Sequence, residues 1–129
     1  MPSKPRVLVV DDEPDVLLTM RLILEAEGFT ASLAADGETA LRRIADEHPD
    51  VVLLDLMMPV LDGWFVLAEL SQRVRRPYVV VCSAKTGDAD RTRAQDLGAD
   101  EYVTKPFDPE DLVALINTLL ASARRPERI

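Results

Sequence analysis

Three aspartates follow two short apolar runs, and this placement constrains the fold more than any other feature of the sequence. Asp11 and Asp12 come directly after the run 6–10, and Asp55 comes directly after the run 51–54. If the two runs are neighbouring strands of a parallel sheet, all three carboxylates lie at the carboxyl edge of that sheet. Like charges ~4 to 6 Å apart repel by a few kcal/mol at an effective dielectric constant of about 20, so a cation must compensate them. Because hard oxygen ligands suit Mg2+, the sequence predicts metal-assisted phosphoryl chemistry.

Short apolar runs alternate with stretches of helical periodicity along the chain. Continuous runs of this kind are typical of parallel strands that are buried on both faces. The predicted strands cover residues 6–10, 29–34, 51–54, 78–82 and 101–104. The predicted helices begin near Pro14, Gly37, Trp64, Asp88 and Pro109. This alternation predicts an α/β fold, an open parallel sheet that binds ligands at its carboxyl edge. The pattern by itself leaves a flavodoxin-like and a Rossmann-like strand order open.

The length and charge of the chain exclude several classes of protein. A chain of 129 residues buries roughly two-thirds of the surface that its unfolded form exposes. We therefore expect a single domain over residues 1–129, with a core from about 6 to 120 and short disordered ends. The 23 acidic and 15 basic residues give a net charge of −8, which argues against direct nucleic-acid binding. Without a long apolar run or an apolar signal segment, we expect a cytoplasmic protein that makes no membrane contact.

Other polar side chains stand where the later strands end. Ser83 follows the predicted strand 78–82, and Lys105 follows the predicted strand 101–104. Each residue alone has an ordinary explanation, because strand ends contact water. Together with the three aspartates, they supply a nucleophilic carboxylate, acids for a metal, a hydroxyl donor and an ammonium group, which are the parts that phosphoryl transfer needs.

The motifs around these residues resemble the receiver domain of bacterial two-component response regulators. They are Val10–Pro14 (VDDEP), Asp55–Gly63 (DLMMPVLDG), Ser83–Ala84 and Lys105–Phe107 (KPF), in the order and at the spacings typical of that family. The likeness covers Arg6 to about Leu120. It implies a five-stranded parallel sheet in the order 2-1-3-4-5, flanked by five helices, which is the flavodoxin-like order. In that order the strands 6–10 and 51–54 are neighbours.

The resemblance also implies roles for the acidic residues. Asp55 would accept a phosphoryl group from a sensor histidine kinase or a phosphotransfer protein. The carboxylates of Asp11, Asp12 and Asp55, together with the backbone carbonyl of Met57, would bind Mg2+ or Mn2+. A metal at this position spreads the charge of the transferring group.

The polar residues of the last two strands match the switching residues of the family. Lys105 would offer a cation to the phosphoryl oxygens. Ser83 would move to hydrogen-bond the phosphoryl group, and Tyr102 would turn inward behind the displaced hydroxyl. The resemblance also implies a cis Lys105–Pro106 peptide bond.

The expected partners bind a face away from the acids. A downstream protein or an output domain would contact the helix 88–97, the strand 101–104 and the helix that begins at Pro109, and a phosphorylation-dependent dimer belongs to the same expectation. The only chemistry expected is phosphorylation of Asp55 and its slow hydrolysis, without turnover of an external substrate. Hydrolysis is expected to be slow because Met57 and Lys85, two residues past Asp55 and Ser83, offer poor groups for orienting water.

Other protein classes fit the sequence less well. A phosphatase of the haloacid dehalogenase type needs an acid two residues after the nucleophile, and that position is Met57. A flavin or nucleotide carrier needs a Gly-rich or Ser/Thr-rich loop after the first strand, where this chain has Asp11–Pro14. A receiver that works without phosphorylation is disfavoured because the acceptor set is complete. Both a stand-alone receiver and the amino-terminal piece of a longer regulator or hybrid kinase remain open.

The helix 88–97 differs from the other predicted helices, because it offers only alanines and one leucine to the core. Such an element belongs to the least stable part of a domain, where moving parts are found. A solvated helix without a switching role fits the composition equally well. Arg91 and Arg93 on this helix are expected to be surface charges, and Trp64 is expected to pack in the core.

Overall fold

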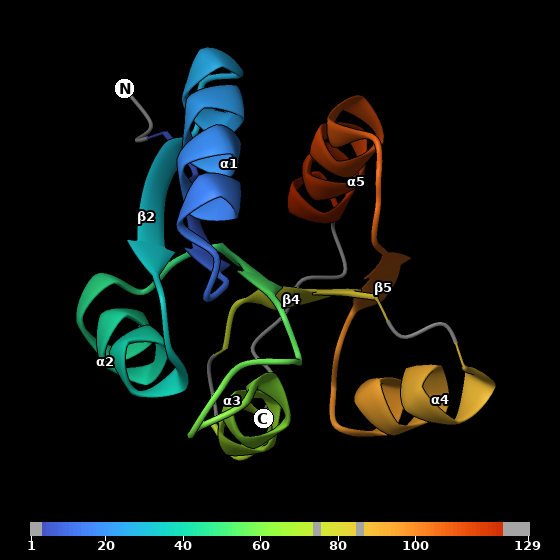
Figure 1. Cartoon of the computed structure of the whole chain (residues 1–129). Helices are drawn as coiled ribbons and strands as arrows, with labels where there is room; N and C mark the ends of the chain where they lie inside the picture. Colours follow the sequence, from blue (N-terminus) through green and yellow to red (C-terminus); the bar gives the residue numbers. More distant parts are fainter. Residues whose placement is uncertain (1–3, 74–75, 85–86, 123–129) are drawn as a thin grey trace.

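The structure, a computed structural model, describes residues 4–73, 76–84 and 87–122 (Figure 1). Most of the two ends that we expect to be disordered lie outside these residues, as does Lys85. Five strands and five helices alternate along the described chain. They are β1 (Arg6–Val10), α1 (Pro14–Ala26), β2 (Thr30–Ala34), α2 (Gly37–Glu47), β3 (Val51–Leu54), α3 (Gly63–Leu70), β4 (Tyr78–Ser83), α4 (Asp88–Asp96), β5 (Glu101–Thr104) and α5 (Pro109–Leu120).

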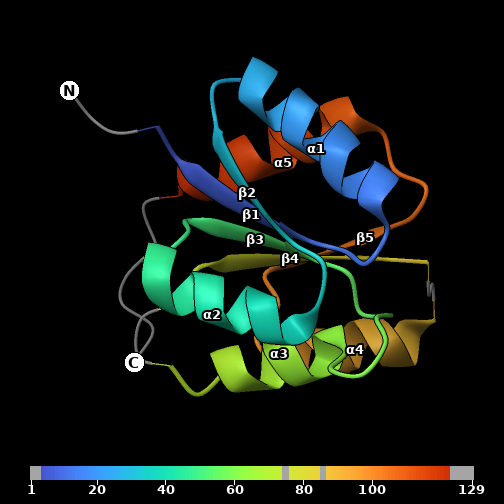
Figure 2. The ribbon, with the colours of Figure 1, turned by 60° about the vertical axis from the view of Figure 1, so that its left-hand side comes forward.

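All five strands are parallel and form one sheet in the order β2-β1-β3-β4-β5, which confirms the predicted order. The sheet lies between two layers of helices, with α1 and α5 on one face and α2, α3 and α4 on the other (Figure 2). Because successive strand side chains point to opposite faces, each face has its own core. Leu17 of α1 and Ile116 of α5 belong to one core, and Ile44 of α2 and Leu67 of α3 belong to the other.

Aspartate side chains cap the starts of α2 and α3. The Asp36 carboxylate accepts a hydrogen bond from the backbone N–H of Thr39 at 2.7 Å, and the Asp62 carboxylate accepts one from the N–H of Phe65 at 3.0 Å. Because Asp62 is this cap, α3 begins at Gly63, one residue before the predicted start, and it ends at Leu70 rather than near residue 73. These caps satisfy N–H groups that the helix itself cannot pair. In the described part of the chain, no helix has the length and apolar character needed to cross a membrane.

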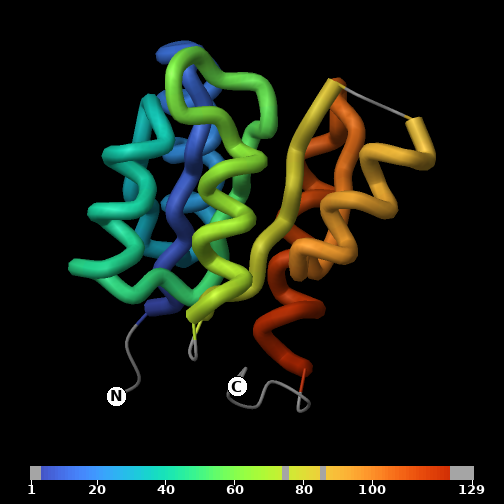
Figure 3. Tube along the Cα trace, turned by 90° about the horizontal axis from the view of Figure 1, so that it is seen from below, coloured from blue at the N-terminus to red at the C-terminus, as the bar shows by residue number. Residues whose placement is uncertain are grey.

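The strand register decides which residues meet at the carboxyl edge. Val10 of β1 pairs with Leu54 of β3, so the residues that follow these two strands emerge at the same level. Ser83 of β4 pairs with Thr104 of β5, so Ser83 is the last residue of its strand rather than the first residue after it. β2 begins at Thr30, one residue later than predicted. The loop between β3 and α3 lies at the opposite end of the domain from the start of β1 and the end of α5 (Figure 3).

Candidate functional site

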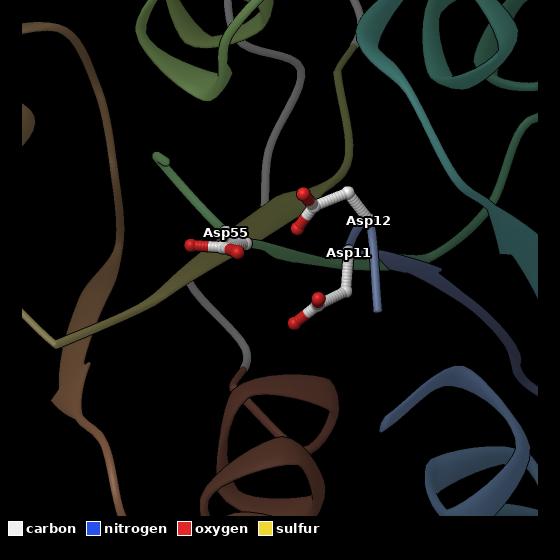
Figure 4. Close-up of side chains that lie close together, drawn as sticks. All are labelled: Asp11, Asp12 and Asp55. Atoms are coloured by element: carbon white, nitrogen blue, oxygen red, sulfur yellow. The ribbon is translucent and has the colours of Figure 1, made fainter. Parts of the chain in front are cut away.

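Three carboxylates gather at the carboxyl edge of the sheet. Asp11, Asp12 and Asp55 each offer one oxygen atom, and these oxygens all lie within 4.8 Å of one another (Figure 4). Asp11 is 3 % exposed and Asp55 is 6 % exposed, whereas Asp12 is exposed. The structure therefore brings together the three acids that the sequence predicted to meet. Two of them are removed from water, which makes their mutual repulsion stronger.

The backbone of the sheet holds the two buried acids in place. The N–H of Asp55 donates to the carbonyl of Val10 at 3.0 Å, and the N–H of Asp11 donates to the carbonyl of Ala34 at 3.1 Å. These bonds continue the ladder of the sheet one residue beyond the strands. Because the two backbones are fixed, the approach of the two carboxylates is built into the strand register and does not depend on a flexible loop.

Each buried acid also accepts a local backbone hydrogen bond. Oδ1 of Asp11 accepts from the N–H of Glu13 at 2.9 Å, and Oδ1 of Asp55 accepts from the N–H of Met57 at 3.1 Å. Both bonds reach two residues along the chain, which is the pattern by which an Asp side chain shapes a turn. The other oxygen of each acid, Oδ2, lies near the ammonium group of Lys105.

Lys105 supplies the cation of the site. Its Nζ atom lies 2.7 Å from Oδ2 of Asp11 and 3.6 Å from Oδ2 of Asp55. Its backbone N–H donates to the carbonyl of Ser83 at 2.8 Å, which fixes the backbone of Lys105 against the end of β4. From there its side chain reaches the acids that follow β1 and β3. The Lys105–Pro106 peptide bond is cis, as expected from the resemblance.

The electrostatic environment alters the proton affinity of two site residues. Burial raises the pKa of Asp55, and the negative charges of Asp11 and Asp12 add to this effect against the opposing influences of the Met57 N–H and Lys105. For Lys105, burial acts to lower the pKa, but the hydrogen bond to Asp11 and the charge of Asp55 outweigh it, so the pKa is raised. Lys105 is therefore positively charged at neutral pH, and Asp55 sits in surroundings that disfavour a bare negative charge.

The loop between β3 and α3 fits closely against Asp55 because Gly63 has no side chain. A Cβ atom at Gly63 would overlap the carbonyl oxygen of Asp55, and a Cβ atom at Gly37 would overlap that of Leu61. Within the same loop, Val60 adopts the left-handed backbone conformation, with φ 66°, and its side chain is fully exposed. A β-branched residue is rare in this conformation, so the loop holds one strained position five residues after Asp55.

The donor set fits a hard divalent cation. Carboxylate and carbonyl oxygens are the ligands that Mg2+ prefers, and Mg2+ keeps several of its waters. The exposed carboxylate of Asp12 faces solvent next to the two buried acids, which leaves one side of the cluster open to a hydrated ion. The backbone carbonyl of Met57, two residues after Asp55, belongs to the same loop. The arrangement can therefore hold a metal beside a carboxylate nucleophile and a lysine.

The two predicted switching residues lie beyond the acid cluster. Ser83 is fully buried. Because side chains alternate along β4, the Ser83 side chain lies on the same face of the sheet as that of Val81, which packs with α2 and α3. Tyr102 on β5 is half-buried against the same core. The structure thus places both residues on one face of the sheet, and it brings the Tyr102 ring against Arg91 rather than against the acids.

Arg93 is exposed, as predicted for a surface charge, whereas Arg91 is half-buried, and both guanidinium groups lie over aromatic rings. The Arg91 guanidinium lies 4.8 Å from the centre of the Tyr102 ring, and that of Arg93 lies 4.0 Å from the centre of the Trp64 ring. Trp64 packs against the core as predicted, but it also carries this cation–π contact. No periodicity in the sequence signals either pair, because the partners lie on different elements.

The comparison with protein families gives one match over most of the chain. The model of the response regulator receiver domain matches residues 7–117. Among curated proteins, the transcriptional regulatory protein PrrA of Mycobacterium leprae is 44 % identical over 118 residues, which are 92 % of this chain and 51 % of that protein. The chain thus spans about half the length of the curated relatives it matches.

Solved structures show the same architecture. The receiver domain of the Francisella response regulator 1452 superposes with a TM-score of 0.85 at 33 % identity, covering 90 % of this chain and 96 % of that one. The BeF3-activated N-terminal receiver domain of RstA from Klebsiella pneumoniae superposes with a TM-score of 0.83 at 27 % identity, covering 91 % and 99 %. Both similarities extend over nearly the whole described chain.

Proposed function

Because the chain belongs to the response regulator receiver domain family, we propose that Asp55 accepts a phosphoryl group from a sensor histidine kinase or a phosphotransfer protein. The observation that carries this proposal is the position of Asp55. It is a buried carboxylate at the end of a central strand, within 4.8 Å of two further acids and 3.6 Å from the ammonium group of Lys105. Asp11 shares these surroundings, but its Oδ2 atom is bound directly by the Lys105 ammonium group at 2.7 Å, whereas Asp55 follows the middle strand of the sheet and its Oδ2 atom lies farther from that group.

The residues around Asp55 would assist the transfer mainly by position and charge. A carboxylate oxygen of Asp55 forms the new bond to phosphorus as the bond between phosphorus and the donor histidine nitrogen breaks. The Met57 N–H holds Oδ1 of Asp55 at 3.1 Å and so orients the nucleophile. The positively charged ammonium group of Lys105 would bind the phosphoryl oxygens, where negative charge is concentrated.

The acid cluster would hold Mg2+ or Mn2+ through Asp11, Asp12, Asp55 and the carbonyl of Met57. When bound, the ion neutralises part of the charge of the transferring group. The reaction would need such a cation, since three carboxylates repel an approaching phosphoryl group. Asp12, the exposed acid of the cluster, would lie on the side from which the ion enters.

Phosphorylation would act on the rest of the domain through Ser83 and Tyr102. The modification adds roughly 1.5 to 2 negative charges and three acceptor oxygens at one point. The Ser83 hydroxyl would move to bind these oxygens, and Tyr102 would turn inward behind it. The expected result is a change in the face formed by α4, β5 and α5, which would bind an output domain, a downstream protein or a second copy. Curated relatives are about twice as long as this chain, which favours an output domain.

Turnover of an external substrate is not part of the proposal. A phosphatase with an aspartate nucleophile needs a general acid two residues further on, and Met57 stands there with an exposed thioether side chain. The phosphorylated domain would therefore be a signalling state that decays slowly by hydrolysis.

The test is phosphorylation with acetyl phosphate and Mg2+, read by intact-protein mass. The expected result is one added phosphoryl group on the wild-type chain and none on Asp55→Asn. As a matched control, Asp50→Asn alters an exposed acid at the opposite edge of the sheet and should be phosphorylated normally. A phosphoryl group on Asp55→Asn at the wild-type yield would refute the assignment of the acceptor.

The metal assignment is tested separately by calorimetric titration with Mg2+. Asp12→Ala should weaken binding at least 10-fold, because it removes one of three carboxylates. Asp46→Ala removes an exposed acid on α2 and should leave the affinity unchanged. Equal affinity in the wild-type chain and Asp12→Ala would exclude this cluster as the metal site.

A further inference from the structure

Two arginines, rather than a broad apolar face, attach α4 to the rest of the domain. Ala94 is the only buried residue of α4, so apolar burial contributes little to its position. Arg93 lies over Trp64 of α3 at 4.0 Å from the ring centre, and Arg91 lies over Tyr102 of β5 at 4.8 Å. These cation–π contacts connect one weakly packed helix to two different neighbours.

Arg91 makes a more extensive contact with β5 than a single ring stack. Its Nη1 donates to the backbone carbonyl of Tyr102 at 3.4 Å, and its Nη2 donates to the hydroxyl of Thr104 at 2.7 Å. Tyr102 and Thr104 are two residues apart on a strand, so their side chains lie on the same face of β5. One half-buried guanidinium therefore contacts both of the residues that face α4 at this end of the strand.

The position of Thr104 connects this contact to the phosphoryl site. Thr104 pairs with Ser83 on the neighbouring strand, and Tyr102 pairs with Val81. Arg91 is thus hydrogen-bonded to the residue directly beside the buried serine. A cavity of about 230 Å3 that is lined by Arg91, Ala94 and Tyr102, among others, lies between α4 and β5. The Tyr102 ring and α4 thus border a pocket rather than a continuously packed interface.

We propose that Arg91 is a positioning residue that holds Tyr102 and Thr104 in the resting arrangement and so determines how readily the domain switches. This inference rests on the proposed function, in which phosphorylation of Asp55 moves Ser83 and Tyr102. For Tyr102 to turn inward, its ring has to leave the guanidinium. Removing the guanidinium takes these contacts from the resting state alone, which shifts the equilibrium toward the switched state.

The experiment measures binding of beryllofluoride, an anion that stands in for the phosphoryl group on Asp55, in the presence of Mg2+. Trp64 is the single tryptophan of the chain, and its contact with Arg93 makes its fluorescence a probe of α4. Arg91→Met keeps the aliphatic stem and removes the charge and both hydrogen bonds. We expect it to bind beryllofluoride roughly 5-fold to 10-fold more tightly than wild type, with unchanged affinity for Mg2+ alone.

Two further variants separate this role from general effects of charge or stability. Arg21→Met removes an exposed arginine of α1 that lies 3.6 Å from Glu25, and it should leave beryllofluoride binding unchanged. Thr104→Val removes the hydroxyl that Arg91 binds and should tighten binding in the same direction as Arg91→Met. Because both variants break one interaction, their effects should not add in the double variant.

Each outcome decides the inference. Wild-type or weaker beryllofluoride affinity in both Arg91→Met and Thr104→Val would overturn the role of Arg91 and leave the proposed function intact. If Arg91→Met does not fold, Thr104→Val alone decides. Absence of Asp55-dependent binding in the wild-type chain would instead overturn the proposed function, and the role of Arg91 with it.

Discussion

The ammonium group of Lys105 lies 2.7 Å from Oδ2 of Asp11, and this contact joins residues that are 94 positions apart in the chain. Asp11 is almost completely buried, whereas the Lys105 side chain keeps 21 % of its exposure. A buried carboxylate without a cation is costly, so the pair stabilises the carboxyl edge before any metal or phosphoryl group arrives.

Lys105→Met should therefore destabilise the domain. In the absence of divalent metal, we expect the free energy of unfolding to fall by roughly 3 kcal/mol, since Asp11 loses the one cation that pairs with it among the described residues. Saturating Mg2+ should restore part of this loss, because a metal bound to the folded state compensates the same charge. Urea unfolding with and without Mg2+ measures both effects. Lys4→Met, at an exposed position, is the control, and a similar loss there would contradict the prediction.

The raised pKa of Asp55 predicts how stability depends on pH. Burial raises this pKa in the folded state, so folded protein keeps the proton at pH values where unfolded protein has lost it. The stability from this group is present below the ordinary carboxyl pKa of about 3.9 and is lost as the pH rises through the folded pKa. Asp55→Asn should thus be more stable than wild type near pH 7 without metal, and the difference should shrink toward pH 4. Urea unfolding across this pH range is the measurement. A stability difference between Asp55→Asn and wild type that grows toward acid pH would contradict the predicted direction.

The side chain of Met57 predicts the lifetime of the phosphorylated state. It is 54 % exposed, two residues after Asp55, and a thioether is a poor hydrogen-bond partner for an attacking water. Met57→Asn should hasten loss of the phosphoryl group about 10-fold, equivalent to about 1.4 kcal/mol of barrier. Decay is followed by intact mass after the phosphodonor is removed. Met57→Leu keeps an apolar side chain and should decay at the wild-type rate, whereas equal rates in all three proteins would exclude control by this residue.

The backbone conformation of Val60 is expected to lower the free energy of unfolding of the domain. Its backbone is left-handed, with φ 66°, and its fully exposed side chain gains nothing from burial. Val60→Asn should raise the free energy of unfolding by about 1 kcal/mol, because Asn tolerates this conformation and a β-branched residue does not. Thermal unfolding should show an increase of a few degrees. Val60→Ala removes the exposed methyl groups but keeps a Cβ atom, so it should recover less stability than Asn does.

Local sequence patterns were sufficient to predict the elements of this protein and the acids that follow its strands. Strands such as Val51–Leu54 are recognisable because both of their faces are buried, so every side chain in the run is apolar. Asp55 follows such a run directly, so its place at the sheet edge is a local property of the chain. The start of α3 was less well predicted, since it depends on the Asp62 side chain rather than on periodicity.

The relations between distant residues required the tertiary structure. Periodicity left two strand orders open, and only the resemblance to a family chose the one that the structure confirms. The pairing of Lys105 with Asp11 and the contact of Arg91 with Tyr102 depend on how strands and helices pack and on which rotamers fit between them. The sequence by itself determined where each strand lies and which residues follow it, to within one residue, because the apolar side chains that mark a buried strand belong to the segment itself. Only packing decided which of those residues touch, because a contact between two elements is a property of neither alone.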